Sequence, residues 1–370
     1  MLSRLLARLK RPRPAAAEIA SARRHPMLSL AGLAPHAPDD LAARHGLEIY
    51  DRMQADAQIA ASLATKKFAV LAHGWEVIEE SSAPADRAAA GFCRFALQEM
   101  QGTVEDTLFG ILDALAKGYS IAEINFRRIE GGQWDGRIGL ASIKHKDPGL
   151  FDFETDEFLN VTGLIRTGAD GAPEKRLPIE KFVVYTYMPS YEEPRGHSDL
   201  RACYKHWWAK DIILRFLSSY LERFGTPVVK GTYRRGMTTN QQDDLLRALE
   251  GIQRETAIVV PEDVTVELLQ ASAQGEQGFT EAIAYHDRQI AKAILGETLT
   301  QEEGHRTGAL ALAKVHQDTM LLRLQKIKRD LEETVVREQV FRPLVALNFP
   351  GASAPRFSLG SLEREGAPAG

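Results

Sequence analysis

Three histidines and one pair of glutamates are the residues whose types could do chemistry in this sequence. A zinc site would need His286, His305 and His316 on one face with a carboxylate. The helical pattern puts His286 and His316 on separate helices and His305 in the polar stretch between them, so we interpret all three as unrelated polar positions. Glu302 and Glu303 could act as an acid/base pair. Without a partner group we favour solvated loop charges.

Standard catalytic motifs are absent from the sequence. It holds no Gly-x-x-x-x-Gly-Lys-Ser/Thr or Gly-x-Gly-x-x-Gly phosphate loop, and neither His-Glu-x-x-His nor Gly-x-Ser-x-Gly. Cys93 and Cys203 lie far apart outside any Cys-x-x-Cys spacing, which predicts reduced, buried thiols. We therefore expect no catalytic residue, no metal and no cofactor, and we do not expect an enzyme.

Composition indicates a folded protein with two or three domains. The 370 residues are 44% hydrophobic and 26% charged, with a formal net charge of −4. A protein that grips DNA firmly is normally basic, so any contact with DNA should be local or transient. No run of 18 apolar residues occurs, and no membrane span is expected.

The N-terminal segment 1–38 is a basic arm. It carries seven lysine and arginine residues against a single acid, Glu18. We interpret it as flexible, with contact to phosphates or to a partner ring as the alternative.

Periodicity divides the remaining chain into a series of elements. Residues 39–196 read as helices followed by a β-rich part, 119–188. Residues 197–224 form a helix that is apolar nearly all round, which predicts burial on more than one side, either in a bundle or against neighbouring subunits. The next segments are a small α/β insert (225–278), a second helix (279–296), a polar loop (297–308), a very long helix (309–349) and a tail (350–370).

The long helix and the tail carry two further predictions. At about 1.5 Å per residue the helix would reach about 50 Å, and Arg342-Pro343 is expected to end it. The tail is rich in Gly, Ala, Pro and Ser, which predicts disorder.

Two residue pairs could bind nucleic acid. Trp207 and Trp208 could stack on bases, but adjacent helical residues point in different directions, so we favour core packing with one interface contact. Arg234 and Arg235 could hold a phosphate, but paired arginines before a glycine turn are more often simply exposed.

Several short motifs in fixed order resemble a known family. They are Gly118–Glu123, Phe224–Pro227, Ile258–Pro261, Asp287–Gly296 followed by Thr298–Thr300, and Arg342–Phe349. From about Asp39 to Phe349 the sequence resembles the portal proteins of tailed bacteriophages, specifically the Mu-like portal family. The resemblance implies an elongated α+β portal fold with a wing, a two-helix stem, a small α/β clip, a tunnel loop and one very long helix. Members of this family usually continue into a helical crown, whereas this sequence ends about twenty residues after Phe349, so either the crown is short or absent or the C-terminus has been trimmed.

By resemblance, the chain would form a dodecameric ring at one capsid vertex of the virion, assembled in the bacterial cytoplasm. Double-stranded DNA would pass through it during packaging and ejection. The terminase large subunit, head-completion or adaptor proteins, the tail, and the major capsid and scaffolding proteins would be its partners. Alternatives are another head–tail connector such as an adaptor, or a nucleic-acid enzyme.

The resemblance also implies roles for particular segments and residues. The wing would be 39–196 with the long helix, the stem 197–224 and 279–296, the clip 225–278 and the tunnel loop 297–308. The implied site residues fall in the tunnel loop (Thr300, Gln301, Glu302, Glu303, His305 and Arg306), in the clip (Lys230, Arg234 and Arg235) and at the stem interface between subunits (Trp207, Trp208, Phe216 and Tyr220).

Overall fold

The computed structural model describes residues 40–156, 158, 160–166, 175–191, 193–224, 228–233, 236, 238–251, 264–269, 273–296 and 320–360. The chain forms two compact units. Unit 1 comprises Met1–Tyr204 and Ile290–Gly370, and unit 2 comprises Lys205–Gln289.

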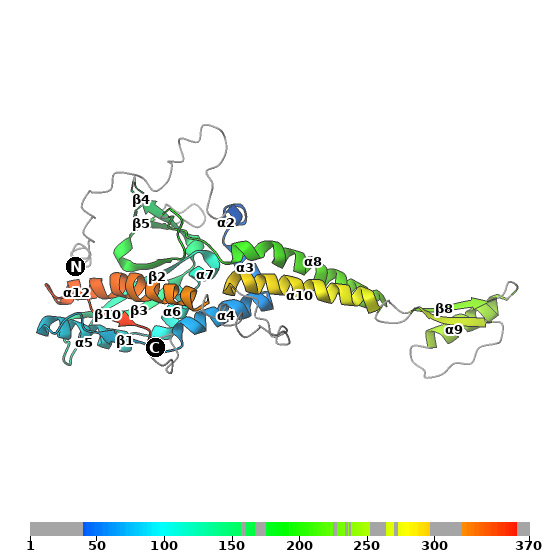
Figure 1. Ribbon diagram of the computed structural model, residues 1–370, viewed down its shortest axis with the longest axis horizontal. Helices are drawn as coiled ribbons and strands as arrows, with labels where there is room; N and C mark the ends of the chain where they lie inside the picture. The colour runs from blue at the N-terminus through cyan, green and yellow to red at the C-terminus, as the bar shows by residue number, and fades with distance from the viewer. Residues whose placement is uncertain are drawn as a thin grey trace, which may run out of the picture. The chain divides into compact units, whose positions relative to one another are not determined.

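Unit 1 begins with short helices that pack beside a sheet (Figure 1). Asp56 caps the third of them, because its carboxylate accepts hydrogen bonds from the backbone N–H groups of Gln58 and Ile59 at 2.9 and 3.2 Å. Gly118 ends the last of them with a φ of +87°. The helices are α2 (Asp40–His45), α3 (Glu48–Gln54), α4 (Ala57–Leu71), α5 (Pro84–Gln98), α6 (Val104–Ile111) and α7 (Ala114–Lys117).

Two antiparallel three-stranded sheets follow, with strand orders β3-β2-β7 and β4-β5-β6. Apolar side chains from both sheets form one buried cluster that includes Tyr119, Phe151, Leu164 and Phe182. Each such side chain stabilises the fold by about 1.5–3 kcal/mol when fully buried. The strands are β2 (Tyr119–Arg128), β3 (Ile138–Lys146), β4 (Phe151–Thr155), β5 (Val161–Arg166), β6 (Lys175–Pro178) and β7 (Phe182–Thr186), and two 3₁₀ turns, Pro148–Leu150 and Ile179–Lys181, join them.

The C-terminal helix is continuous from Met320 to Asn348. It contains a π-helical segment, η4 (Asp330–Phe341), and ends in α12 (Arg342–Asn348). The prediction that Arg342-Pro343 ends this helix is wrong. Pro343 lies in the first turn of α12, after the widened π segment, where a missing N–H costs little. Residues 309–319 of the predicted helix lie outside the described residues.

Two amide side chains of this helix bind the two outer strands of the β3-β2-β7 sheet. Gln339 accepts from the N–H of Val184 at 2.8 Å and donates to its carbonyl at 2.9 Å. Asn348 does the same with the N–H and carbonyl of Ile138, at 2.8 and 2.9 Å. Each amide satisfies an edge that would otherwise lack a partner, so the helix is fixed across the sheet at both edges.

The predicted disorder of the tail 350–370 is wrong for residues 350–360. Strand β10 (Arg356–Ser358) pairs antiparallel with β1 (Glu76–Ile78). Phe357 is buried and its ring lies 6.0 Å from those of Trp75 and Phe341. Apolar residues at alternate positions, Phe357 and Leu359, are buried when this segment pairs with β1. The composition of the tail does not show this alternation. Residues 361–370 lie outside the described residues.

Unit 2 contains most of two long helices and a small α/β part. Helices α8 (Leu200–Phe224) and α10 (Ala273–Leu295) lie side by side (Figure 1). Helix α10 starts six residues before the predicted 279, because Gly275 and Gly278 are tolerated within it. Beyond the pair, β8 (Val228–Tyr233) and β9 (Val264–Leu269) form an antiparallel ribbon, and α9 (Thr239–Gly251) packs on β8 through Leu245 and Leu249 over Gly231.

Candidate functional site

The helix pair of unit 2 has an apolar outer face. Trp208 and Phe216 of α8 are 55% and 60% exposed. Trp207 is half-buried, and Tyr220 lies against Phe279 of α10 with ring centroids 5.7 Å apart. The apolar residues of α8 are therefore of two kinds. Some pack against α10, and others are exposed in the single chain. Leu214, Leu221 and Tyr285 add to the exposed apolar area.

Polar contacts join the inner faces of α8 and α10. Lys210 is buried and its ammonium lies 2.5 Å from the Asp287 carboxylate. His206 and His286 meet through their Nδ1 atoms at 3.1 Å. Buried polar pairs of this kind fix how two helices register, since an apolar face alone permits sliding.

Two described residues on either side of 297–319 approach each other in unit 1. Gly296, the residue after α10, has a φ of +86°, and a Cβ placed on it would come within 2.8 Å of the Arg323 guanidinium. Arg323 lies one turn into the described part of the C-terminal helix. We call this approach of Gly296 and Arg323 the loop root; the predicted tunnel loop, 297–308, itself lies outside the described residues.

A buried lysine lies beside the loop root. The Lys66 ammonium donates to the Asp199 carboxylate at 2.7 Å, to the Tyr187 hydroxyl at 3.1 Å and to the carbonyl of Ile294 at 3.1 Å. All three of its hydrogens are thus used. The carbonyl belongs to the last turn of α10, where a cation is favoured by the helix dipole. Helix α4, strand β7 and the adjoining ends of α8 and α10 are therefore joined through one side chain.

Burial dominates the electrostatics around Lys66. It raises the pKa of Asp199 above the ordinary carboxyl value, while Lys66, Tyr187 and Arg323 act in the opposite direction. The pKa of the Tyr187 hydroxyl is also raised, by burial first and then by Asp199. Arg323 thus links the loop root electrostatically to Asp199, which immediately precedes α8.

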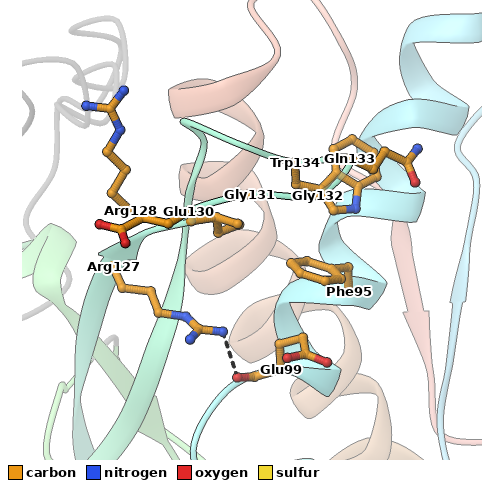
Figure 2. Close-up of a pocket in the computed structure, with 10 residues that line it drawn as sticks. Phe95, Glu99, Arg127, Arg128, Glu130, Gly131, Gly132, Gln133 and Trp134 are labelled. Atoms are coloured by element: carbon orange, nitrogen blue, oxygen red, sulfur yellow. Dashed lines mark hydrogen bonds between the residues drawn. The ribbon is translucent and has the colours of Figure 1, made fainter.

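A hollow of about 620 Å³ lies at the β2–β3 turn, beside the end of α5 (Figure 2). Arg127 donates to the carbonyl of Glu99 at 3.0 Å on one side, and the rings of Phe95 and Trp134 lie on the other. The lining contains two arginines and two glutamates, so its formal charges balance, and it contains no nucleophile next to a base. Its residues are Phe95, Glu99, Arg127, Arg128, Ile129, Glu130, Gly131, Gly132, Gln133 and Trp134.

The described residues contain neither a metal cluster nor a membrane span. There, no group of three or more His, Cys, Asp and Glu side chains is placed to hold a metal ion. In the same part of the chain, no helix combines the length and apolar character needed to cross a bilayer. Cys93 and Cys203 are buried thiols, as predicted, and burial raises the pKa of Cys203 to about 12.

Comparison with known proteins identifies the family. The family model described as "Portal protein of Mu bacteriophage" matches residues 47–367. The chain belongs to this family. Two curated relatives agree: Mu-like prophage FluMu protein gp29 of Haemophilus influenzae, 27% identical over 322 residues, and the portal protein of Escherichia phage Mu, 27% identical over 315 residues. These alignments cover 85% and 84% of this chain but 60% and 58% of the relatives, so the chain spans about 60% of their length.

Solved structures show the same fold. A chain in the neck of an empty gene transfer agent particle has a TM-score of 0.58 at 13% identity, covering 90% of this chain and 88% of its own. A chain in the neck of a native particle, computed with C12 symmetry, has the same score and identity, covering 85% and 83%. The predicted α+β portal fold is thereby confirmed.

The portal site residues predicted from sequence are described only in part. Of the stem residues, Trp208 and Phe216 are exposed and Trp207 and Tyr220 are half-buried. Lys230 is exposed on β8. All six tunnel-loop residues, with Arg234 and Arg235, lie outside the described residues, as do His305 and His316. Sequence reasoning missed the cluster around Lys66 and the His206–His286 pair, because each joins residues far apart in sequence.

Proposed function

We propose that this chain is the subunit of a portal ring at one vertex of a phage-like capsid, through which double-stranded DNA enters and leaves. The observation that carries the proposal is the family match, which runs through both units and both long helices of unit 2. The wing is then 39–196 with the C-terminal helix, the stem is α8 with α10, the clip lies between them, and 297–308 is the tunnel loop.

The stem face supports assembly into a ring. Trp208 and Phe216 of α8 are large apolar side chains that are more than half exposed in the single chain, and a partner that covered them would remove this apolar area from water. A second copy of the chain is the occupant we propose, packed through a heterologous contact that closes into a ring. One similar gene transfer agent neck was computed with C12 symmetry and another with C6 symmetry, and a ring of twelve copies is compatible with both.

The tunnel loop is proposed to guide DNA without holding it firmly. Thr300, Gln301, Glu302, Glu303, His305 and Arg306 carry charges of both signs, and the whole chain has a net charge of −4. Each phosphate that a protein neutralises strengthens salt-dependent binding to DNA, and many such contacts would slow the passage of the duplex. The loop root at Gly296 and Arg323 would anchor this contact to the stem and to the C-terminal helix.

We propose a separate set of partners for the clip and for the wing. The clip, with Lys230, Arg234 and Arg235, would receive the terminase large subunit during packaging and adaptor or head-completion proteins afterwards. The wing would contact the major capsid and scaffolding proteins. The assembled ring would reside in the virion, after assembly in the bacterial cytoplasm. Its role is structural, and no catalytic residue is proposed.

Ring formation is tested by negative-stain microscopy and mass measurement of the purified full chain. The wild type should form rings with a central hole. Trp208→Glu and Phe216→Glu should abolish them, because each buries a charge in the proposed interface. Leu150→Glu, at an exposed apolar position in unit 1, serves as the matched control and should leave the ring intact. A wild type that stays monomeric under capsid-assembly conditions would overturn the proposal. A ring whose subunit number is not twelve, with a correspondingly different diameter, would indicate an adaptor instead.

The tunnel loop is tested by deleting Gln301–Arg306 in an assembled particle and measuring packaged DNA and its retention. We expect both to fall while ring formation persists. Wild-type packaging together with wild-type retention would show that the loop does not contact DNA in the proposed way.

A further inference from the structure

Two histidines meet head-on between the stem helices. His206 of α8 and His286 of α10 have their Nδ1 atoms 3.1 Å apart and their ring centroids 5.4 Å apart. The difference of 2.3 Å is close to the sum of the two ring radii, so both nitrogens lie near the line that joins the rings. That is the geometry of an N–H···N hydrogen bond.

A bridging proton explains this contact better than a bridging metal ion. Two imidazoles that bind one ion converge on a point away from the line between their nitrogens, because the angle at the metal is far from straight. The rings would then lie closer together at the same nitrogen separation. An N–H···N hydrogen bond between these atoms requires one ring to donate from Nδ1 and the other to accept at Nδ1.

The surroundings of the pair disfavour a second proton. Both rings are half-buried, and the Tyr285 ring lies 6.2 Å from His206 and 5.3 Å from His286. Lys205 adds positive charge beside His206. Asp287, the carboxylate next to His286, is bound by Lys210 at 2.5 Å. The pKa of His206 is lowered, by burial first and then by Lys205 and His286.

We propose that the His206–His286 contact is a pH-sensitive latch, which joins α8 to α10 at neutral pH and opens when both imidazoles carry a full charge. Two imidazolium rings have no acceptor between them and repel each other at this distance. Because the pKa of His206 is lowered on folding, the stabilisation is present above the ordinary histidine value of 6.5 and is lost as pH falls through the lower folded value.

The latch concerns one subunit and does not require the ring. It gives the helix pair a built-in response to acid.

Hydrogen exchange read by mass spectrometry on the full-length protein tests the latch. Exchange in Lys205–Leu221 and Phe279–Gln289 is compared at about pH 7.5 and about pH 5.5, after correction for the intrinsic pH dependence of exchange. In the wild type, corrected exchange should be faster at the lower pH, by up to about tenfold for each unit by which folding lowers the pKa. Unchanged protection would overturn the proposal.

Two variants assign the effect. His206→Gln and His286→Gln each replace a titrating ring by an amide that can still hydrogen-bond, so the acid response should disappear in both. His197→Gln, at an exposed histidine in unit 1, should retain the wild-type response. If both stem variants respond to acid as the wild type does, the latch is not this pair. Where one variant fails to fold, the other and the wild-type comparison still decide.

Discussion

The three-way contact of Lys66 makes the sharpest stability prediction. Lys66→Met keeps most of the aliphatic stem but removes the ammonium, leaving the Asp199 carboxylate buried without its cation. The side chains of Lys66 and Asp199 are only 2% and 11% exposed, so water cannot replace the lost partner. Removing one member of a buried ion pair costs about 3–5 kcal/mol, and we expect the free energy of unfolding to fall by that amount.

The neighbouring lysine provides a matched control. Lys67 is also buried and pairs with Asp113, but the Asp113 side chain is 54% exposed. Once Lys67 is changed to Met, that carboxylate can be hydrated, so the loss should be about 1 kcal/mol. Urea unfolding followed by tryptophan fluorescence measures both variants, with equal slopes showing that only stability has changed.

A double variant isolates the pair. Combining Lys66→Met with Asp199→Leu removes both charges, so it should be more stable than the sum of the single losses predicts, by at least about 2 kcal/mol. In Lys66→Met alone, the pKa of Asp199 should rise further, because the cation that lowers it is gone. A carboxyl with a raised pKa stabilises the fold at low pH and loses that contribution as pH rises, so the deficit of this variant should grow with pH. Additive losses, or a Lys66→Met cost equal to that of Lys67→Met, would refute the reasoning.

Three further predictions follow from the backbone contacts and can be read by the same unfolding measurement. Gly118→Ala should lower the free energy of unfolding far more than Gly131→Ala. Both glycines have positive φ, which costs alanine about 1–2 kcal/mol, but only at Gly118 would a Cβ collide with the backbone. Equal losses in the two variants would contradict this. Gln339→Leu and Asn348→Leu should each lower the free energy of unfolding by about 1–3 kcal/mol, because each leaves the N–H and carbonyl of one strand residue without a partner. A loss no larger than that of the same substitution at an exposed glutamine would show that water replaces the lost amide. Gly296→Ala should cost about 1–2 kcal/mol through its φ of +86°, with little added by the flexible arginine it faces, and a larger loss would indicate a rigid loop root.

Local patterns predicted most of the elements. The apolar residues of 119–129 predicted strand β2, whose first four residues are all buried, and the apolar residues around 200–224 predicted helix α8. The resemblance supplied the family, because several short motifs recur in fixed order. The errors fell where packing overrides local preference. Pro343 continues a helix because the π segment precedes it, and Phe357 is ordered because β1 offers it an edge.

By itself, the sequence determined the α+β class, the family and the approximate positions of helices α8 and α10. Those depend on periodicity and on motif order, which are properties of the chain read locally. Only the tertiary structure decided which polar groups meet. Lys66 and Ile294, Gln339 and Val184, and His206 and His286 are far apart in sequence, and each contact needs the fold to remove both groups from water at once. The sequence treats His286 as an unrelated polar position; burial against a second imidazole turns it into half of a proton-sharing pair.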